Sequence, residues 1–179
     1  MSDKWVITNI KGFIEKAAEC GLAFKANGNS RGAVIIFYDM YCPGCALMEM
    51  DLGDYFKELR SKGVDIIYID FPVHKVDMLH AKARVIYRRN PEDFLKVLDS
   101  AYGDMINKGN LIKDLDVSDN DAKAELENVR NCKSTAQSIG IKGTPTIIIA
   151  KYGRDTATAV FGYIGPHEVM DLVSRELFQ

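Results

Sequence analysis

Two apolar runs separated by a helical stretch constrain the fold of this chain more than any other feature. Ala33 to Tyr38 and Val64 to Phe71 are rich in Val and Ile and are apolar without alternation, as is typical of strands covered on both faces. Between them, apolar residues from Leu47 to Leu59 recur at helical spacing. Strand, helix and strand in this order predict two parallel strands joined by a right-handed crossover.

The helix begins at a pair of cysteines, in the segment Cys42-Pro43-Gly44-Cys45. Proline suits the first position of a helix because its missing N–H needs no partner there. A cysteine just before that position lies at the helix N-terminus, where free N–H groups and the positive end of the dipole stabilise a thiolate. We therefore expect Cys42 to be an exposed, attacking thiol and Cys45, one turn further on, to be a more buried, resolving thiol.

A single Cys-x-x-Cys pair is also half of a zinc or iron–sulfur site. Such a site usually needs a second pair of ligands, but Cys20, Cys132 and the three histidines are scattered along the chain. We expect no metal and no cofactor. Cys20 and Cys132 are expected to be inert buried thiols rather than a second disulfide.

The rest of the chain is helical between residues 73 and 139 and mixed elsewhere. Asn90-Pro91 predicts the start of a helix that runs toward Gly109. Arg84, Arg88 and Arg89 are expected to form a solvated basic face. The turn-forming run 27–32 predicts a hairpin loop after an edge strand at 22–25. Further helices are expected over 9–20, 118–131, 132–139 and 166–178, and further strands over 146–150 and 159–164.

A proline opens the strand after the helical stretch, in Thr144-Pro145-Thr146. Together with the cysteines this resembles the thioredoxin superfamily, in which the proline that faces the active site is cis. The long helical stretch resembles the DsbA family in particular. Three segments carry that likeness: Asp39 to Cys45 is similar to the family's Asp-Phe-x-Cys-Pro-x-Cys, Phe71-Pro72-Val73 to its Phe-Pro-Leu, and Ile139 to Thr146 to its approach to the proline.

The resemblance implies an α/β, thioredoxin-like fold with a helical subdomain inserted between the second core strand and the cis-proline strand. Residues 1–72 and 140–179 would form the thioredoxin-like domain, and residues 73–139 the insert. The implied activity is thiol–disulfide exchange with protein substrates, served by a redox partner that reoxidises or reduces the site. Its direction, as oxidase, isomerase or reductase, stays open. The residues expected to contact substrate are Tyr41, Pro43, Gly44, Thr144 and Pro145.

Two positions depart from the family's pattern. Many relatives carry a carboxylate six residues before the first cysteine, where this chain has Ile36. Asp39 and Glu49 are candidates for the proton relay, although Asp39 also fits a strand-end residue and Glu49 a solvated helix face. Strongly oxidising relatives carry His at the position of Gly44. Because glycine offers no side chain to stabilise the thiolate, we expect a less oxidising disulfide.

Charge and composition favour neither nucleic acid nor membrane as a partner. The net charge is −2 and the pI is about 5.9, which gives no global attraction to polyanions or anionic lipid. No apolar run approaches the roughly 18 residues needed to cross a bilayer. Nothing resembling a secretory signal opens the sequence, so a cytoplasmic protein is expected, with an exported protein whose signal is absent here as the alternative.

We also expect a monomer, because the segment before Ala33 is too short for the dimerisation domain that dimeric isomerases of similar chemistry carry. Two other functions stay open at this point. One is a redox-inactive peptide-binding or chaperone module on the same fold, and the other is a metal-binding protein.

Overall fold

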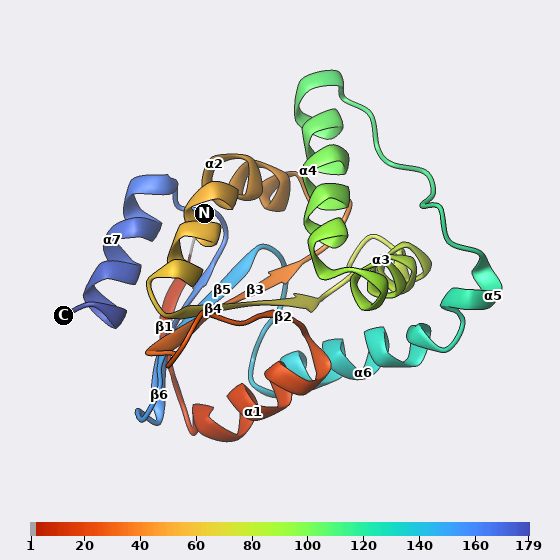
Figure 1. The fold of residues 1–179 in the computed structure, drawn as a ribbon. Coiled ribbons are helices and arrows are strands. Elements are labelled where there is room, and N and C mark those ends of the chain that lie inside the picture. The colour runs from red at the N-terminus through yellow and green to blue at the C-terminus, as the bar shows by residue number, and fades with distance from the viewer. Residues whose placement is uncertain (1–2) are drawn as a thin grey trace.

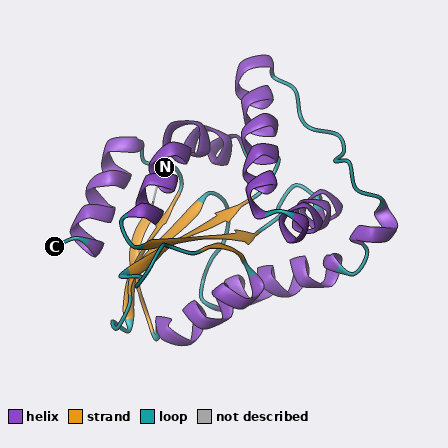
Figure 2. Ribbon diagram, in the orientation of Figure 1, coloured by secondary structure: helices purple, strands orange, loops and turns teal. Residues whose placement is uncertain are grey.

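The computed structural model describes residues 3–179, in which one sheet lies between two layers of helices (Figure 1, Figure 2). The strands are β1 (Asp3–Thr8), β2 (Leu22–Phe24), β3 (Gly32–Tyr38), β4 (Val64–Asp70), β5 (Thr146–Lys151) and β6 (Thr156–Phe161). The helices are α1 (Ile10–Cys20), α2 (Pro43–Ser61), α3 (Asp77–Arg89), α4 (Pro91–Lys108), α5 (Asp119–Ala122), α6 (Glu125–Ser138) and α7 (Pro166–Leu177).

The predicted parallel pair forms the centre of the sheet, whose strand order is β1-β6-β5-β3-β4-β2. Strands β3 and β4 are parallel, every residue in both is buried, and α2 makes the crossover between them. Strand β5 lies antiparallel to β3. Helices α3 to α6 fall between β4 and β5, so the predicted fold, thioredoxin-like with a helical insertion, is confirmed. The domain boundaries at residues 73 and 139 stay a prediction.

Each face of the sheet has its own core. On the face covered by α2, α4 and α7, Phe94 of α4 packs within 5.5–6.2 Å of three aromatic rings on the sheet, measured between ring centroids: Phe24, Tyr38 and Tyr68. On the face covered by α1 and α6, Phe13 stacks on Phe37. The inserted helices therefore share the core of the sheet. None of the helices within residues 3–179 is long and apolar enough to span a bilayer.

The edges of the sheet differ from the sequence-based expectation. Strand β1 was not predicted, because Asp3–Thr8 mixes polar and apolar residues and lies mostly exposed, paired with β6 on one side only. Strand β2 forms no hairpin with β3. It pairs antiparallel with β4, because β4 already occupies that side of β3, and the 27–32 loop crosses to reach β3. Strand β6 begins and ends earlier than expected, and α6 runs unbroken through Cys132.

Cys20 and Cys132 form a disulfide, with their Cα atoms 5.7 Å apart. The expectation of two inert thiols was therefore wrong. Helices α1 and α6 cover the same face of the sheet, which brings together two residues separated by 112 positions in sequence (Figure 1). No spacing rule links cysteines so far apart, because only the tertiary packing of α1 against α6 makes them neighbours.

The expected basic face of α3 is not uniformly solvated. Arg84 is only 2% exposed and donates to the buried carboxylate of Asp70 and to the carbonyl of Cys20. Arg88 pairs with Glu125. The reason is that α6 packs against α3 and turns part of that face inward.

Candidate active site

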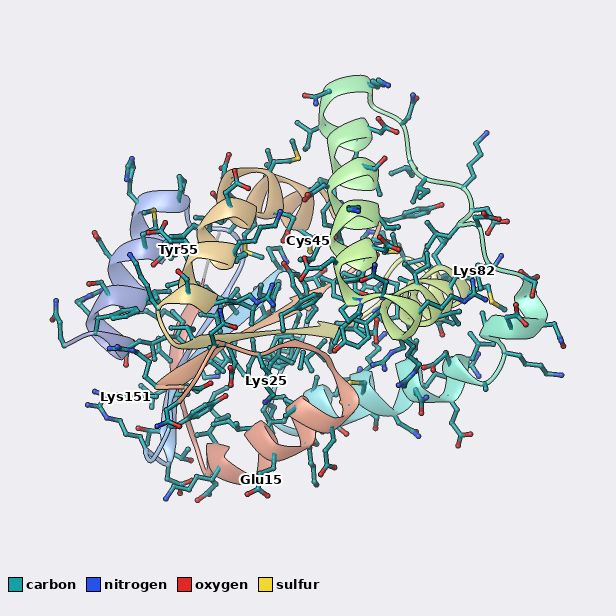
Figure 3. All side chains as sticks on the ribbon, viewed as in Figure 1. Glu15, Lys25, Cys45, Tyr55, Lys82 and Lys151 are labelled. Carbon is teal, nitrogen blue, oxygen red and sulfur yellow. A yellow bond between two sulfur atoms is a disulfide. The ribbon has the colours of Figure 1, made fainter. Side chains whose placement is uncertain are left out.

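Cys42 caps the N-terminus of α2, as predicted from the proline that follows it. Its Sγ accepts the backbone N–H of Cys45 at 3.2 Å, and its carbonyl accepts the N–H of Ala46 at 3.1 Å. Figure 3 places Cys45 near the start of α2, beside α4. Both thiols are free and both are buried, Cys42 with 5% exposed and Cys45 with 1%. The expectation of an exposed Cys42 was wrong, because the Thr144-Pro145 loop packs against the start of α2.

The two thiols have opposite pKa shifts. The hydrogen bond from the Cys45 side chain lowers the pKa of Cys42 to about 6, with help from the Thr144 hydroxyl and the Cys45 backbone N–H. Burial and the charge of Asp39 oppose this shift. Burial, followed by the neighbouring Cys42, raises the pKa of Cys45 well above its ordinary value. At neutral pH the pair therefore holds one thiolate, on Cys42, and one thiol, on Cys45.

The Thr144–Pro145 peptide bond is cis and lies directly beside the cysteines. A Cβ atom at Gly44 would lie 3.0 Å from Pro145 Cδ and 3.9 Å from Cys42 Sγ, which is tighter than ordinary contact with the ring. The absence of a side chain at Gly44 is what allows this close approach. The buried Thr144 hydroxyl has no hydrogen-bond partner among the described residues, but its interaction with the two thiols lowers the pKa of both.

Asp39 ties two loops together next to the cysteines. Its carboxylate is fully buried and accepts the N–H of Tyr41 at 2.8 Å, of Val73 at 2.7 Å and of His74 at 3.0 Å. The ring Nδ1 of His74 lies 2.7 Å from the same carboxylate. His74 was not singled out in the sequence. The available signal was the parallel pairing of β3 and β4, whose carboxyl ends bring the residues that follow them to one edge.

Glu49 is not on a solvated face. It is 5% exposed and lies on the buried side of α2, one turn beyond Cys45. Both of its carboxyl oxygens lie 3.0 Å from the Tyr68 hydroxyl, which is their donor. Burial, together with the charge of Asp99, raises the pKa of Glu49 to about 7, against the Tyr68 hydrogen bond. Ile36 sits opposite Tyr68 in the register of β3 and β4, so the carboxyl group in this layer comes from α2.

The remaining predicted contact residues border the same site. Pro43 is exposed, Gly44 and Tyr41 are partly exposed, and the Tyr41 hydroxyl donates to the carbonyl of Ile112 at 2.6 Å. Ile112 belongs to the irregular segment between α4 and α5. The structure thus brings every predicted site residue except Glu49 to the start of α2, and it places Glu49 one turn deeper. Within residues 3–179, no three His, Cys, Asp or Glu side chains gather as a metal site would require.

Comparison with known proteins agrees with this geometry. A family model described as a thioredoxin-like domain matches residues 23–175. No curated protein matches the sequence. Three similar solved structures share its fold at low sequence identity.

The catalytic domain of Proteus mirabilis ScsC has a TM-score of 0.72 at 16% identity, over 96% of this chain and 98% of that one. A periplasmic thioredoxin-like protein from Salmonella enterica serovar Typhimurium has a TM-score of 0.67 at 18% identity, over 95% of this chain and 99% of that one. Pseudomonas aeruginosa DsbA2 has a TM-score of 0.66 at 13% identity, over 84% of this chain and 91% of that one. The DsbA-like fold predicted from the sequence is confirmed, and this chain belongs to the thioredoxin-like family.

Proposed function

We propose that this protein is a thiol–disulfide oxidoreductase that exchanges disulfides with protein substrates through Cys42 and Cys45. The observation that carries the proposal is the opposite ionisation of two thiols at one helix start. A thiolate is the attacking species in disulfide exchange, and a low pKa supplies it at neutral pH. A protonated Cys45 beside it does not compete for the substrate.

The exchange then runs in two steps. The Cys42 thiolate attacks one sulfur of a substrate disulfide, which forms a mixed disulfide and releases the other substrate sulfur as a thiolate that takes up a proton. Cys45 then loses its proton and attacks Cys42 Sγ, which releases the second substrate sulfur and leaves a Cys42–Cys45 disulfide. The same steps in reverse oxidise a substrate dithiol.

Substrate is proposed to lie along the cis-proline loop. The loop at Thr144 and Pro145 covers Cys42, so a substrate sulfur that reaches Cys42 must pass beside it. Tyr41, Pro43 and Gly44 retain exposed surface around the same sulfur. We assign these five residues to substrate contact.

Glu49 is our candidate for the proton relay. The resolving step needs a base for the Cys45 proton, and a carboxyl group with a pKa near 7 can both accept and return a proton at neutral pH. The carboxylate of Asp39 is the weaker candidate, because its oxygens already accept hydrogen bonds from Tyr41, Val73 and His74.

The test is disulfide exchange by the wild-type protein and by two single variants. Cys42→Ser is expected to abolish exchange, and Cys45→Ser to accumulate mixed disulfides with substrate, seen by mass spectrometry. Exchange at the wild-type rate in both variants would refute the proposal. A peptide-binding or chaperone module would instead keep its activity in Cys42→Ser. Equilibration with a glutathione buffer measures the reduction potential of the Cys42–Cys45 disulfide, and this potential decides whether the protein acts as a reductase or an oxidase. A difference of about 30 mV in that potential corresponds to about 1.4 kcal/mol.

For the compartment we favour the exported alternative over the cytoplasmic one. The Cys20–Cys132 bond supports it, because structural disulfides form and persist mainly in oxidising environments. One protein of the same fold is described as periplasmic. Rapid alkylation of free thiols in intact cells tests the assignment. Two protected cysteines at positions 20 and 132 are expected, and two free thiols there would argue for a reducing compartment.

A further inference from the structure

Two inserted helices hold the loop that leads into Cys42. Met40 is fully buried, and its backbone N–H donates to Nε2 of His80, on α3, at 3.1 Å. The carbonyl of Asp39 accepts the hydroxyl of Tyr102, on α4, at 2.8 Å. The same carbonyl accepts the N–H of Cys42 at 3.1 Å. The backbone of residues 39–42 is therefore held in place by side chains of α3 and α4, rather than by β3 and α2, which it connects.

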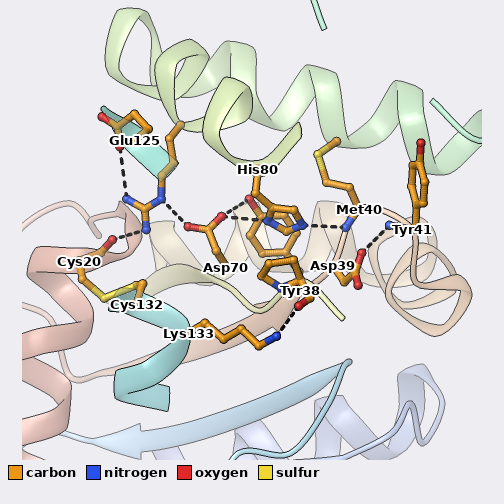
Figure 4. A network of polar contacts seen from close by, with 12 residues as sticks. Cys20, Tyr38, Asp39, Met40, Tyr41, Asp70, His80, Glu125, Cys132 and Lys133 are labelled. Carbon is orange, nitrogen blue, oxygen red and sulfur yellow. Dashed lines mark hydrogen bonds and ion pairs between the residues drawn. A yellow bond between two sulfur atoms is a disulfide. The ribbon is translucent and has the colours of Figure 1, made fainter. Parts of the chain in front are cut away.

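Met40 on one side and Asp70 on the other hold His80 in one tautomer (Figure 4). Because Met40 donates to Nε2, that nitrogen carries no proton, and the ring proton lies on Nδ1. Nδ1 lies 3.0 Å from Asp70 Oδ1 and donates to it. The Asp70 carboxylate is fully buried, and it also accepts the hydroxyl of Tyr38 at 3.0 Å and pairs with Arg84.

We propose that His80 is a positioning residue of the active site, which holds the loop before Cys42 so that this cysteine remains the cap of α2. The inference rests on the proposed function and adds a role for the inserted helices. A purely structural histidine would serve only Asp70, which Arg84 and Tyr38 already satisfy. The second nitrogen of His80 is instead the partner of a buried N–H at the active site.

The consequence for the thiolate follows from the geometry of the cap. Buried N–H groups in proteins are almost always paired, so loss of the His80 acceptor forces the 39–42 loop to move toward another partner. Cys42 Sγ then leaves the position in which it accepts the Cys45 N–H at 3.2 Å. The thiolate loses that hydrogen bond and its place at the helix N-terminus.

The experiment measures the titration of the Cys42 thiolate, by its absorbance near 240 nm, in the reduced full-length protein. His80→Phe removes both ring nitrogens, whereas His80→Gln keeps an amide donor and a carbonyl acceptor. Tyr38→Phe is the matched control, because it removes a different hydrogen bond from the same oxygen of Asp70 and leaves Met40 untouched. Tyr102→Phe removes the second support of the loop.

We expect the Cys42 midpoint to rise by about one pH unit in His80→Phe, which is a roughly tenfold fall in the ratio of thiolate to thiol at fixed pH. We expect it to rise in Tyr102→Phe as well. It should stay near the wild-type value in His80→Gln and Tyr38→Phe. A folded His80→Phe protein with an unchanged midpoint overturns the proposal, as does an equal shift in Tyr38→Phe. If His80→Phe does not fold, His80→Leu, which also lacks both ring nitrogens, takes its place, and a folded His80→Leu protein with an unchanged midpoint overturns the proposal. The readout requires no catalysis, so it stands even if exchange activity is never detected.

Discussion

At the residue scale, hydrogen-bond donors and burial decide the ionisation of each acidic group in the site. Cys42 and Cys45 share one helical turn, but one is stabilised as an anion by donors and the other is kept neutral by burial. Glu49 lies on the same buried face of α2, and burial raises its pKa to about 7. Each of these groups can therefore be tested by removing one named contact.

The reactivity of Cys42 should depend on the Thr144 hydroxyl. The rate of alkylation by a small reagent is expected to rise with pH through a midpoint near 6, where the thiolate forms. Thr144→Val keeps the shape of the side chain but removes its hydroxyl, so the midpoint should move to higher pH. Thr158→Val is the control, because Thr158, on β6, donates its hydroxyl to Glu176 of α7. An unchanged midpoint in Thr144→Val would exclude a role for its hydroxyl.

Glu49 should make the folded protein less stable as pH rises. Its pKa is about 7 in the folded state and 4.5 ordinarily, so between these values the folded state binds more protons than the unfolded one. At 1.36 kcal/mol per unit, the loss across this window is at most about 3 kcal/mol. Glu49→Gln keeps an acceptor for Tyr68 and should remove this pH dependence.

Chemical unfolding at pH 4.5 and pH 7.5 measures the effect. Glu58→Gln serves as the control, because Glu58 is exposed and pairs with the exposed side chain of Lys62. The wild type and this control should both lose stability over the window. If Glu49→Gln loses as much stability between pH 4.5 and pH 7.5 as the wild type, the pH dependence comes from other groups.

The residues of the site were predictable to different degrees. Local spacing and the chemistry of proline were enough to predict Cys42, Cys45 and Pro145. The burial of Cys42 was not predictable, because it depends on a loop from the far end of the chain. His74 and His80 gave no local signal either, since a histidine acquires its role from the carboxylate or N–H that tertiary packing places beside it.

At the scale of elements, the segment between α4 and α5, residues 109–117, contains neither helix nor strand, yet it borders the active site through Ile112 (Figure 1). One buried amine holds it. Lys82 of α3 is 5% exposed, and its Nζ lies 2.7 Å from Asp114 and 2.7 Å from Asp119. Lys82 (Figure 3) therefore anchors both this segment and the start of α5.

Lys82→Met should release the 109–117 segment without disturbing the sheet. Trypsin is expected to cleave after Lys113 faster than in the wild type, because a protease needs a segment that can leave the surface. Lys96→Met removes an exposed pair with Asp93 and is the control. Mass spectrometry of the fragments identifies the cut. Cleavage at the wild-type rate in Lys82→Met would mean that Tyr41 and the core contacts alone hold the segment.

Elements with strong local signals were predicted best. Helix α4 has Asn90 as its cap, Pro91 at its start and Gly109 in the left-handed conformation at its end, all as the sequence indicated. Strand β1 and the partner of β2 were missed because edge strands carry little apolar patterning, and their neighbours are chosen by the whole sheet.

At the scale of the molecule, the Cys20–Cys132 bond joins the first helix to the last inserted helix. The inserted helices are fixed to the thioredoxin-like part at this bond and at the aromatic cluster around Phe94. The hydrogen bonds of His80 and Tyr102 to the loop before Cys42 join them to it as well. Arg84, on α3, contacts α1 next to this bond, because it donates to the carbonyl of Cys20.

Removal of this disulfide should cost substantial stability. Closing a loop of this length restricts the unfolded chain by an amount that chain-entropy arguments put at about 3–5 kcal/mol. The double variant Cys20→Ala/Cys132→Ala should lose that much in urea unfolding and should no longer respond to reductant. Cys42→Ser/Cys45→Ser is the control and should keep the response. A double variant as stable as the wild type would show that packing alone joins the two helices.

The long span of this bond also sets an order of events during synthesis. Cys20 leaves the ribosome first, and Cys42 and Cys45 follow long before its partner Cys132. The earliest thiols that Cys20 can meet are therefore those of the active site, and a bond to either would keep α2 from forming its start. Correct maturation requires that β3 and α2 bury Cys42 and Cys45 before Cys20 is oxidised, or that another molecule reshuffles the wrong bond. A protein proposed to exchange disulfides in others would then depend on the same chemistry for its own biogenesis.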